Sequence, residues 1–171
     1  MIKKLLILAG LVFTMSMSVD AQRIAIIDVS SILNDMSEYK VAQQEVDKIA
    51  AAWRQEIGVE YDKIKSMYNK YQAEQVLLSE DQKSEKEGEI MEAEKSVREM
   101  QKQRFGPEGD LFRKRQELVQ PIQEKVFATI EEFASDRGYD IIFDKAGSAG
   151  ILFTSDEYDK TLDVKRKLGL Q

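Results

Sequence analysis

Three aspartates flank short apolar runs, and their carboxylates are the groups in this sequence best placed for chemistry. Asp28 ends the run "RIAIIDV", and Asp140 and Asp144 enclose the apolar part of "YDIIFDK". Converging carboxylates can transfer protons or hold a cation. However, the chain contains no His and no Cys, and no nucleophile or lysine motif accompanies these aspartates. Because strand-end aspartates commonly accept backbone N–H bonds in turns, we expect no catalytic residue, no metal site and no enzyme.

A second candidate is the glycine-containing stretch "KAGSAG", residues 145–150. Phosphate-binding loops need a defined glycine spacing followed by a Lys-Ser or Lys-Thr pair, and this stretch has neither. It predicts a turn between two strands. We therefore expect no bound nucleotide or other cofactor.

The N-terminus has the pattern of an export signal. Lys3 and Lys4 precede the apolar run "LLILAGLVF", and small residues, Val19 and Ala21, stand before Gln22. This order predicts a signal peptide over residues 1–21, cleaved after Ala21. A retained anchor is the alternative, but the run is shorter than the roughly 20 apolar residues that span a bilayer.

The charge of the mature chain limits its partners. Without residues 1–21 it has 23 basic and 30 acidic residues, a net charge of −7. Bulk attraction to nucleic acid or to anionic lipid requires the opposite sign. We therefore expect no nucleic-acid partner.

Short strands and a very long helical insert organise the sequence. "RIAIIDV" predicts a buried strand, and the next strands, "YDIIFDK" and "GILFTS", lie within residues 139–155. Strands this short are not stable alone. They must meet, so the intervening hundred-odd residues must run out and return. The ending "TLDVKRKLGL" predicts one more short helix.

The insert has the heptad spacing of a coiled coil. In the outgoing half, apolar residues recur at intervals of three and four: Ala42, Val46, Ile49, Trp53, Ile57, Tyr61, Ile64, Tyr68 and Tyr71. The returning half repeats this with Ile90, Ala93, Val97 and Met100, and then with Leu111, Leu118, Ile122, Val126, Ile130 and Phe133. A compact helical bundle, the alternative, would need more breaks.

Signals in the sequence set the ends of the two arm helices. Ser79 and Gln82 have the spacing of a capping box, so the sequence predicts helices over residues 37–78 and 80–136 with a tip near residues 78–82. Gly138 is placed to end the second helix.

The returning helix contains a break, "RFGPEGD". Gly106, Pro107 and Gly109 all disfavour a helix interior, yet the apolar spacing resumes after them. We therefore expect an interruption at residues 105–109, opposite residues 53–58, that acts as a hinge. Pro121 predicts a milder bend closer to the strands.

Together these features predict an α+β fold with two parts. Residues 22–36 and 137–171 form a small head that contains the strands, and residues 37–136 form an antiparallel coiled-coil hairpin, the arm. A head of about 55 residues buries little apolar surface by itself. Several copies can share one core, so we expect the head to be the site of oligomerisation.

The sequence resembles the Skp/OmpH family of periplasmic chaperones over residues 22–171. The resemblance is carried by "RIAIIDVSSILNDMSEYKVAQQEV", "RQELVQPIQEKVFATIEEFASDRGYDIIFDK" and "GILFTSDEYDKTLDVKRKLG", in this order around the hairpin. It implies a homotrimer joined through the heads, with three arms around a cavity. It also implies a periplasmic, ATP-independent holdase that keeps unfolded outer-membrane proteins from aggregating. An exported coiled-coil adaptor with one dedicated partner is the alternative.

A holdase needs adaptable apolar surfaces rather than a shaped pocket. The candidate client-contacting residues outside the strict heptad positions are Val59, Met67, Met91, Phe105, Phe112 and Val119. For each one alone, an ordinary packing role is the alternative.

In charge, the sequence departs from the family. The best-known member is strongly basic, whereas residues 79–99 here carry eight acidic and four basic residues. This argues against contact with lipopolysaccharide or membrane. A small basic cluster near the break, Lys102, Arg104, Arg113, Lys114 and Arg115, is diluted by acidic neighbours and predicts a solvated helix face.

Overall fold

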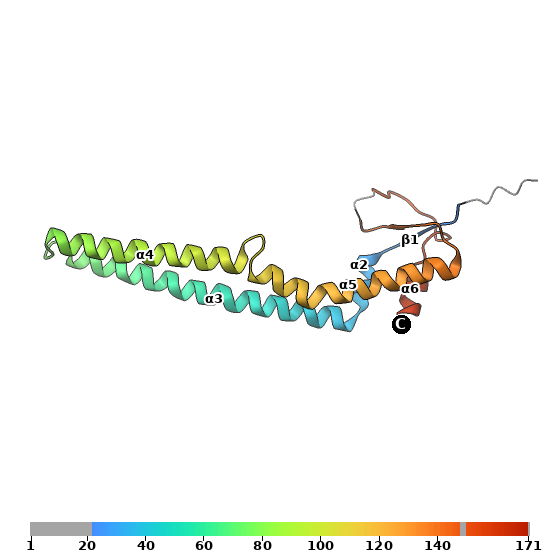
Figure 1. The fold of residues 1–171 in the computed structure, drawn as a ribbon, viewed down its shortest axis with the longest axis horizontal. Coiled ribbons are helices and arrows are strands. Elements are labelled where there is room, and N and C mark those ends of the chain that lie inside the picture. Colours follow the sequence, from blue (N-terminus) through green and yellow to red (C-terminus); the bar gives the residue numbers. More distant parts are fainter. Residues whose placement is uncertain (1–21, 148–149, 171) are drawn as a thin grey trace, which may run out of the picture.

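The computed structural model describes residues 22–147 and 150–170, and the predicted signal peptide lies outside them. A long helical hairpin extends from a small head (Figure 1). In chain order the elements are β1 (Ile24–Ile27), α2 (Val29–Asp35), α3 (Ser37–Glu74), α4 (Glu80–Phe105), α5 (Asp110–Arg137), β2 (Ile141–Asp144) and α6 (Thr161–Lys167). The predicted α+β class with a long hairpin arm is confirmed.

The head sheet explains why the chain must leave and return. β1 pairs with β2 in parallel, with Ile24 opposite Ile141 and Ile27 opposite Asp144. Parallel neighbours need a long crossover connection, and here the crossover is the entire arm. On the other edge of β1, the backbone N–H of Ile26 donates to Tyr158 O at 2.8 Å.

The predicted strand "GILFTS" is wrong for the single chain. Residues 150–155 have no strand structure, and the bridge to β1 is made by Asp159 instead. Both edges of β1 are therefore occupied. The side chains of Leu152 and Phe153 are left 99% and 85% exposed.

The head core draws on both ends of the chain. Ile27, Ile32, Val126 and Val164 are at most 2% exposed, and they come from β1, α2, α5 and α6 respectively. The last turns of α5 thus belong to the packing of the head, although the helix itself continues to Arg137. Gly138 follows in the left-handed region, with φ at 65°, as predicted for the C-terminal stop.

In the arm, α3 runs alongside α4 and then α5 (Figure 1). The helices pack along a narrow apolar seam. α3 has 38 residues, which corresponds to about 57 Å. Two predicted seam residues lie at the edge instead, since Tyr61 and Tyr68 are each 45% exposed. A tyrosine hydroxyl needs water or a partner, and at Tyr61 it donates to Gln101 Oε1 at 3.4 Å.

The arm tip confirms the capping box but shortens the first helix. α3 ends at Glu74, before the predicted residue 78. Gln82 N–H donates to Ser79 Oγ at 3.4 Å, and Ser79 N–H donates to Gln82 Oε1 at 3.0 Å. These reciprocal bonds satisfy donors that the first turn of α4 would leave unpaired.

The break in the returning helix is also confirmed, between the end of α4 at Phe105 and the start of α5 at Asp110. At Gly109 a Cβ atom would lie 2.6 Å from Gln103 O, and at Gly106 it would overlap Lys102 O. The two glycines therefore permit the close backbone approach that forms the break. α5 continues through Pro121 as one helix.

Candidate functional site

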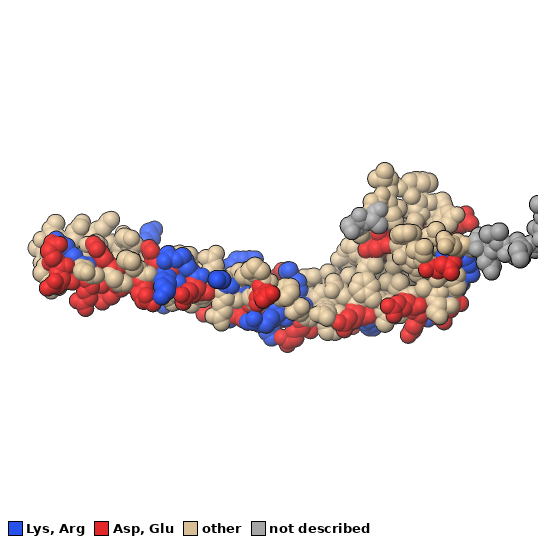
Figure 2. Space-filling model, turned by 45° about the horizontal axis from the view of Figure 1, so that its top comes forward, with Lys and Arg blue, Asp and Glu red and all other residues tan. Residues whose placement is uncertain are grey.

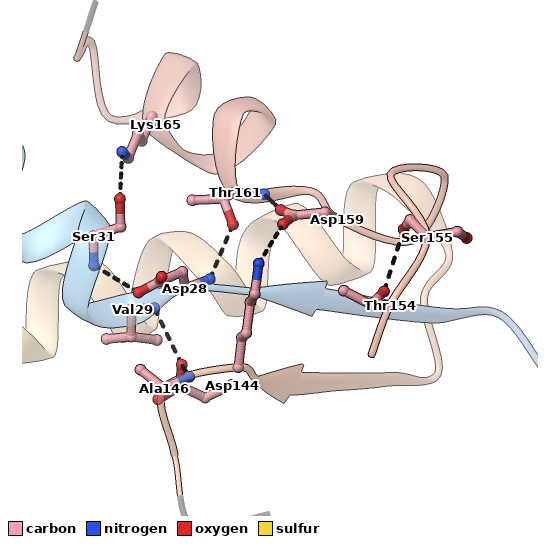
Figure 3. A network of polar contacts seen from close by, with 11 residues as sticks. Asp28, Val29, Ser31, Asp144, Ala146, Thr154, Ser155, Asp159, Thr161 and Lys165 are labelled. Atoms are coloured by element: carbon pink, nitrogen blue, oxygen red, sulfur yellow. Dashed lines mark hydrogen bonds and ion pairs between the residues drawn. The ribbon is translucent and has the colours of Figure 1, made fainter. Parts of the chain in front are cut away.

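The three aspartates considered for chemistry accept hydrogen bonds from backbone N–H groups in the head, and Figure 3 shows two of them, Asp28 and Asp144. Asp28 Oδ1 accepts from the Ser31 N–H at 2.7 Å and caps α2. The Asp28 N–H in turn donates to Thr161 Oγ1 at 2.9 Å. Asp28 therefore joins the start of α2 to the start of α6.

The carboxylates of Asp144 and Asp140, at the two ends of β2, also accept hydrogen bonds from backbone N–H groups. Asp144 Oδ1 accepts from the N–H groups of Val29 at 3.2 Å and Ala146 at 3.0 Å. Asp140 Oδ2 accepts from the Arg23 N–H at 2.7 Å. The predicted role of these carboxylates as acceptors of backbone N–H bonds is thus confirmed. The local turn or cap bonds are those of Asp28 and Asp144, whereas Asp140 bonds to a residue distant in the chain.

Asp159 and Lys145 complete the network beside a polar hollow of about 530 Å³. Asp159 Oδ1 accepts from the Thr161 N–H at 3.0 Å, and Lys145 Nζ lies 3.6 Å from Asp159 Oδ2. Burial favours the neutral carboxyl, but the bonds from Thr161 and the nearby Lys145 outweigh it, so the pKa of Asp159 lies below 3.8.

Lys165 links α6 to α2. Its Nζ donates to Ser31 Oγ at 2.8 Å and to Asp35 Oδ2 at 2.6 Å. The hydrogen bond and the positive charge of Lys165 hold the pKa of Asp35 below its ordinary value. The network therefore ties the two ends of the chain together.

Within the described ranges 22–147 and 150–170, no group of three or more metal-ligating side chains occurs. None of the helices in this part of the chain has the length and apolar character needed to cross a bilayer.

The arm has its own cluster, at the break. The rings of Trp53 and Phe105 meet edge to face, with centroids 6.3 Å apart. The Arg104 guanidinium lies 4.6 Å from the centre of the Trp53 ring, and its Nη1 donates to Asp110 Oδ2 at 2.9 Å. The cluster confirms that the break lies opposite residue 53, and Arg104 connects α3, α4 and α5.

The basic cluster around the break is largely paired. Arg104 and Arg113 both contact Asp110, and Lys114 Nζ lies 2.7 Å from Glu117 Oε2. Figure 2 shows acidic side chains gathered at the arm tip, with Lys and Arg interleaved with acids along the middle of the arm. This pairing agrees with the predicted solvated helix face.

The six candidate client-contacting residues divide by burial. Val59, Met91 and Phe112 are 48%, 67% and 45% exposed. Met67 and Phe105 are partly buried and pack against the part of the seam between α3 and α4, which we call the outer seam. Val119 is only 3% exposed and packs with Ala42 and Val46, so it belongs to the seam rather than to an accessible surface.

On the arm, the structure adds four exposed apolar side chains that sequence reasoning missed: Val41, Val76, Leu77 and Phe127. Leu77 is 84% exposed at the arm tip. The early end of α3 at Glu74 accounts for its exposure. Val41 and Phe127 could have been found from the sequence, because both fall outside the heptad positions.

Comparisons with known proteins agree with this architecture. The crystal structure of an OmpH-like protein from Caulobacter crescentus, described as a candidate outer membrane chaperone, is similar to this structure. The TM-score is 0.69 and the sequences are 10% identical. The match covers 86% of this chain and 84% of that chain. No curated protein matches. The family model for outer membrane protein (OmpH-like) matches residues 23–168. The chain therefore belongs to the OmpH-like outer membrane protein family.

Proposed function

We propose that this protein is a periplasmic holdase that binds unfolded outer-membrane proteins and prevents their aggregation. The observation that carries the proposal is the distribution of exposed apolar side chains over the charged arm, from Val41 through Val59 and Met91 to Phe112. A dedicated partner site would concentrate such residues in one packed patch. Dispersed, adaptable contacts suit many unfolded clients instead.

The holdase acts as a homotrimer joined through the heads. The apolar side chains of Leu152 and Phe153 face solvent, and Ile141 and Phe143 on β2 are 39% and 38% exposed. Residues 150–155 then form their strand against a neighbouring copy, and the three arms enclose the client cavity. Light scattering of the mature chain should give a trimer mass, and a monomer would contradict this assembly.

Client release requires no nucleotide, because many weak contacts can be lost in succession to a folding environment that binds the client better. The acidic arm tip disfavours lipopolysaccharide and membrane as partners, since anionic surfaces repel it. The protein is thus a carrier without catalytic activity.

An aggregation assay tests the holdase function. A β-barrel outer-membrane protein unfolded in urea is diluted into buffer with and without a severalfold excess of trimer. We expect turbidity to be suppressed with the trimer present. Unchanged aggregation would reject the holdase function and favour an adaptor with one dedicated partner.

The break acts as the hinge of the arm and lets the cavity adapt to clients of different size. Replacing Gly106, Pro107 and Gly109 by Ala favours a continuous helix, because the present backbone approach leaves no room for Cβ atoms at the two glycines. Spin labels on the arm tip and the head should then give a narrower distance distribution. An unchanged distribution and an unchanged client capacity would mean that the break is a tolerated irregularity.

A further inference from the structure

A hollow of about 490 Å³ lies along the base of the arm, between the first turns of α3 and the first half of α5. We call it the glutamine groove, because four of its eight lining residues are glutamines. Its lining consists of Tyr39, Gln43, Phe112, Arg115, Gln116, Val119, Gln120 and Gln123. Phe112, 45% exposed, is its main accessible apolar side chain. The groove therefore combines neutral amides with two aromatic side chains, Tyr39 and Phe112.

From this lining we propose that the glutamine groove binds the backbone of an extended segment of the unfolded client. This inference rests on the proposed holdase function and assigns it a specific site. A side-chain amide both donates and accepts hydrogen bonds, so it can pair with a peptide N–H or C=O in either chain direction. Because glutamine carries no charge, such pairing depends little on the client sequence.

The spacing along α5 fits an extended chain. Phe112, Gln116 and Gln120 are four residues apart, which is about 6 Å along the helix axis per step. Alternate residues of an extended strand repeat at about 6.6 Å, so three successive positions on one face of a strand can meet these three side chains. The groove from Phe112 to Gln123 is about 16 Å long and holds about five extended residues.

Two of the four glutamine amides already donate hydrogen bonds to other side chains of the protein. Gln120 Nε2 donates to Glu124 Oε1 at 2.7 Å, and Gln43 Nε2 donates to the Tyr39 hydroxyl at 2.9 Å. These bonds fix the two side chains at the wall of the groove and leave their carbonyl oxygens as acceptors. Gln116 is solvent-exposed and Gln123 is half-buried, and within the described ranges no hydrogen bond joins their amides to another side chain.

The occupant we infer is a strand-forming segment of a β-barrel client. Such segments alternate apolar and polar residues with a period of two. One face of the segment can therefore place an apolar side chain against Phe112, while its backbone meets Gln116 and Gln120. Arg115, which also lines the groove, adds a single positive charge.

Site-specific photo-crosslinking tests the assignment. A benzophenone amino acid replaces Gln116 in the groove or, as the control, Lys114, whose side chain is 43% exposed and lies on another face of α5. Each trimer is mixed with a urea-unfolded β-barrel outer-membrane protein and irradiated. We expect severalfold more client adduct from position 116. Equal or lower yield at position 116 would overturn the inference.

A matched pair of variants gives an independent readout. Gln116→Ala with Gln123→Ala should raise the apparent Kd for the unfolded client about threefold to tenfold, as expected from lost hydrogen bonds. Gln44→Ala with Gln72→Ala removes two exposed glutamines of α3 outside the groove and should leave the Kd unchanged. If both pairs still bind and protect the client like the parent, the groove assignment fails and the holdase function stands. If the parent itself does not suppress aggregation, the function fails first.

Discussion

The head and the outer arm, the part in which α3 packs against α4, are stabilised by different kinds of apolar packing. In the head, Ile32 and Val164 are fully buried, in a core that α2, α5, α6 and β1 share. In the outer arm, the seam between α3 and α4 is a single row whose most buried residues, Ile90 and Val97, are still 4% exposed. The head therefore resists deformation, whereas most of the arm surface remains available for contacts.

The polar contacts of the head and of the arm also differ, because those of the head join residues that are far apart in the sequence. In the head, the Asp28 N–H bonds to Thr161 and Lys165 bonds to Ser31, over more than 130 residues of chain. In the arm, ion pairs such as Lys83 with Glu80 are three residues apart within one helix. Exposed pairs of this kind contribute little. Polar contacts thus fix the tertiary structure of the head, whereas most ion pairs of the arm lie within single helices. The contacts of Arg104 with Glu56 and Asp110, and of Lys125 with Glu38, do join arm helices.

Truncating one buried isoleucine in the head and one in the arm should give the largest difference between the two regions in lost free energy of unfolding. Ile32→Ala in the head should lower the free energy of unfolding by about 3 to 4 kcal/mol, and Ile90→Ala in the arm by about 2 kcal/mol, because a thin seam collapses more easily around a cavity. Urea titrations followed by circular dichroism measure both values. Equal losses would contradict the proposed difference in packing.

The two helix caps allow a second comparison. Asp28→Ala and Ser79→Ala each remove a side-chain cap worth about 1 kcal/mol. The head variant should lower global stability, because Asp28 also connects to α6. The tip variant should increase hydrogen exchange only near the first turn of α4. Global destabilisation by Ser79→Ala would show that the tip is coupled to the whole arm.

Arg104→Ala tests the contact between the three helices at the break. It removes the ion pair with Asp110 and the contact with Trp53, together about 0.5 to 1 kcal/mol after allowing for solvent screening. Trp53 is the single tryptophan of the sequence, so its fluorescence should shift to the red. Lys102→Ala, an exposed change on the same helix end, serves as the control. An emission spectrum unaffected by Arg104→Ala would argue against this contact.

The smallest expected effect is on pH dependence and is confined to the head. The pKa values of Asp35 and Asp159 are lowered below 3.8 in the folded chain. Their contribution is therefore fully present above about pH 4 and is lost as pH falls through the lower folded pKa values. The urea midpoint of Asp159→Asn should lie below that of the parent at pH 7, and the two midpoints should converge as the pH falls below the lowered pKa of Asp159. Parallel curves would exclude this role for Asp159.

Local signals in the sequence predicted local features well. The capping box at Ser79, the stop at Gly138 and the break at Gly106 each depend on the conformations that a few neighbouring residues allow. The heptad spacing likewise predicted the hairpin, although Tyr61 and Tyr68 lie at its edge.

Features that depend on contacts between residues far apart in the sequence could not be predicted from local signals. The strand expected at residues 150–155 lacks a partner in one chain, and Asp159 takes the edge of β1 instead. The contact of Lys165 with Asp35 requires knowledge that α6 packs on α2. The glutamine groove exists only because the start of α3 lies beside α5, and no single segment contains that information.

The central claim is that a rigid head carries client-binding arms, and hydrogen exchange of the protein with and without an unfolded β-barrel client tests it most directly. We predict slower exchange in the arm peptides of α3, α4 and α5 when the client is bound, with the largest change beside the glutamine groove. Exchange in β1, α2 and α6 should stay the same. Protection confined to the head, or no change in the arms despite a bound client, would contradict the account.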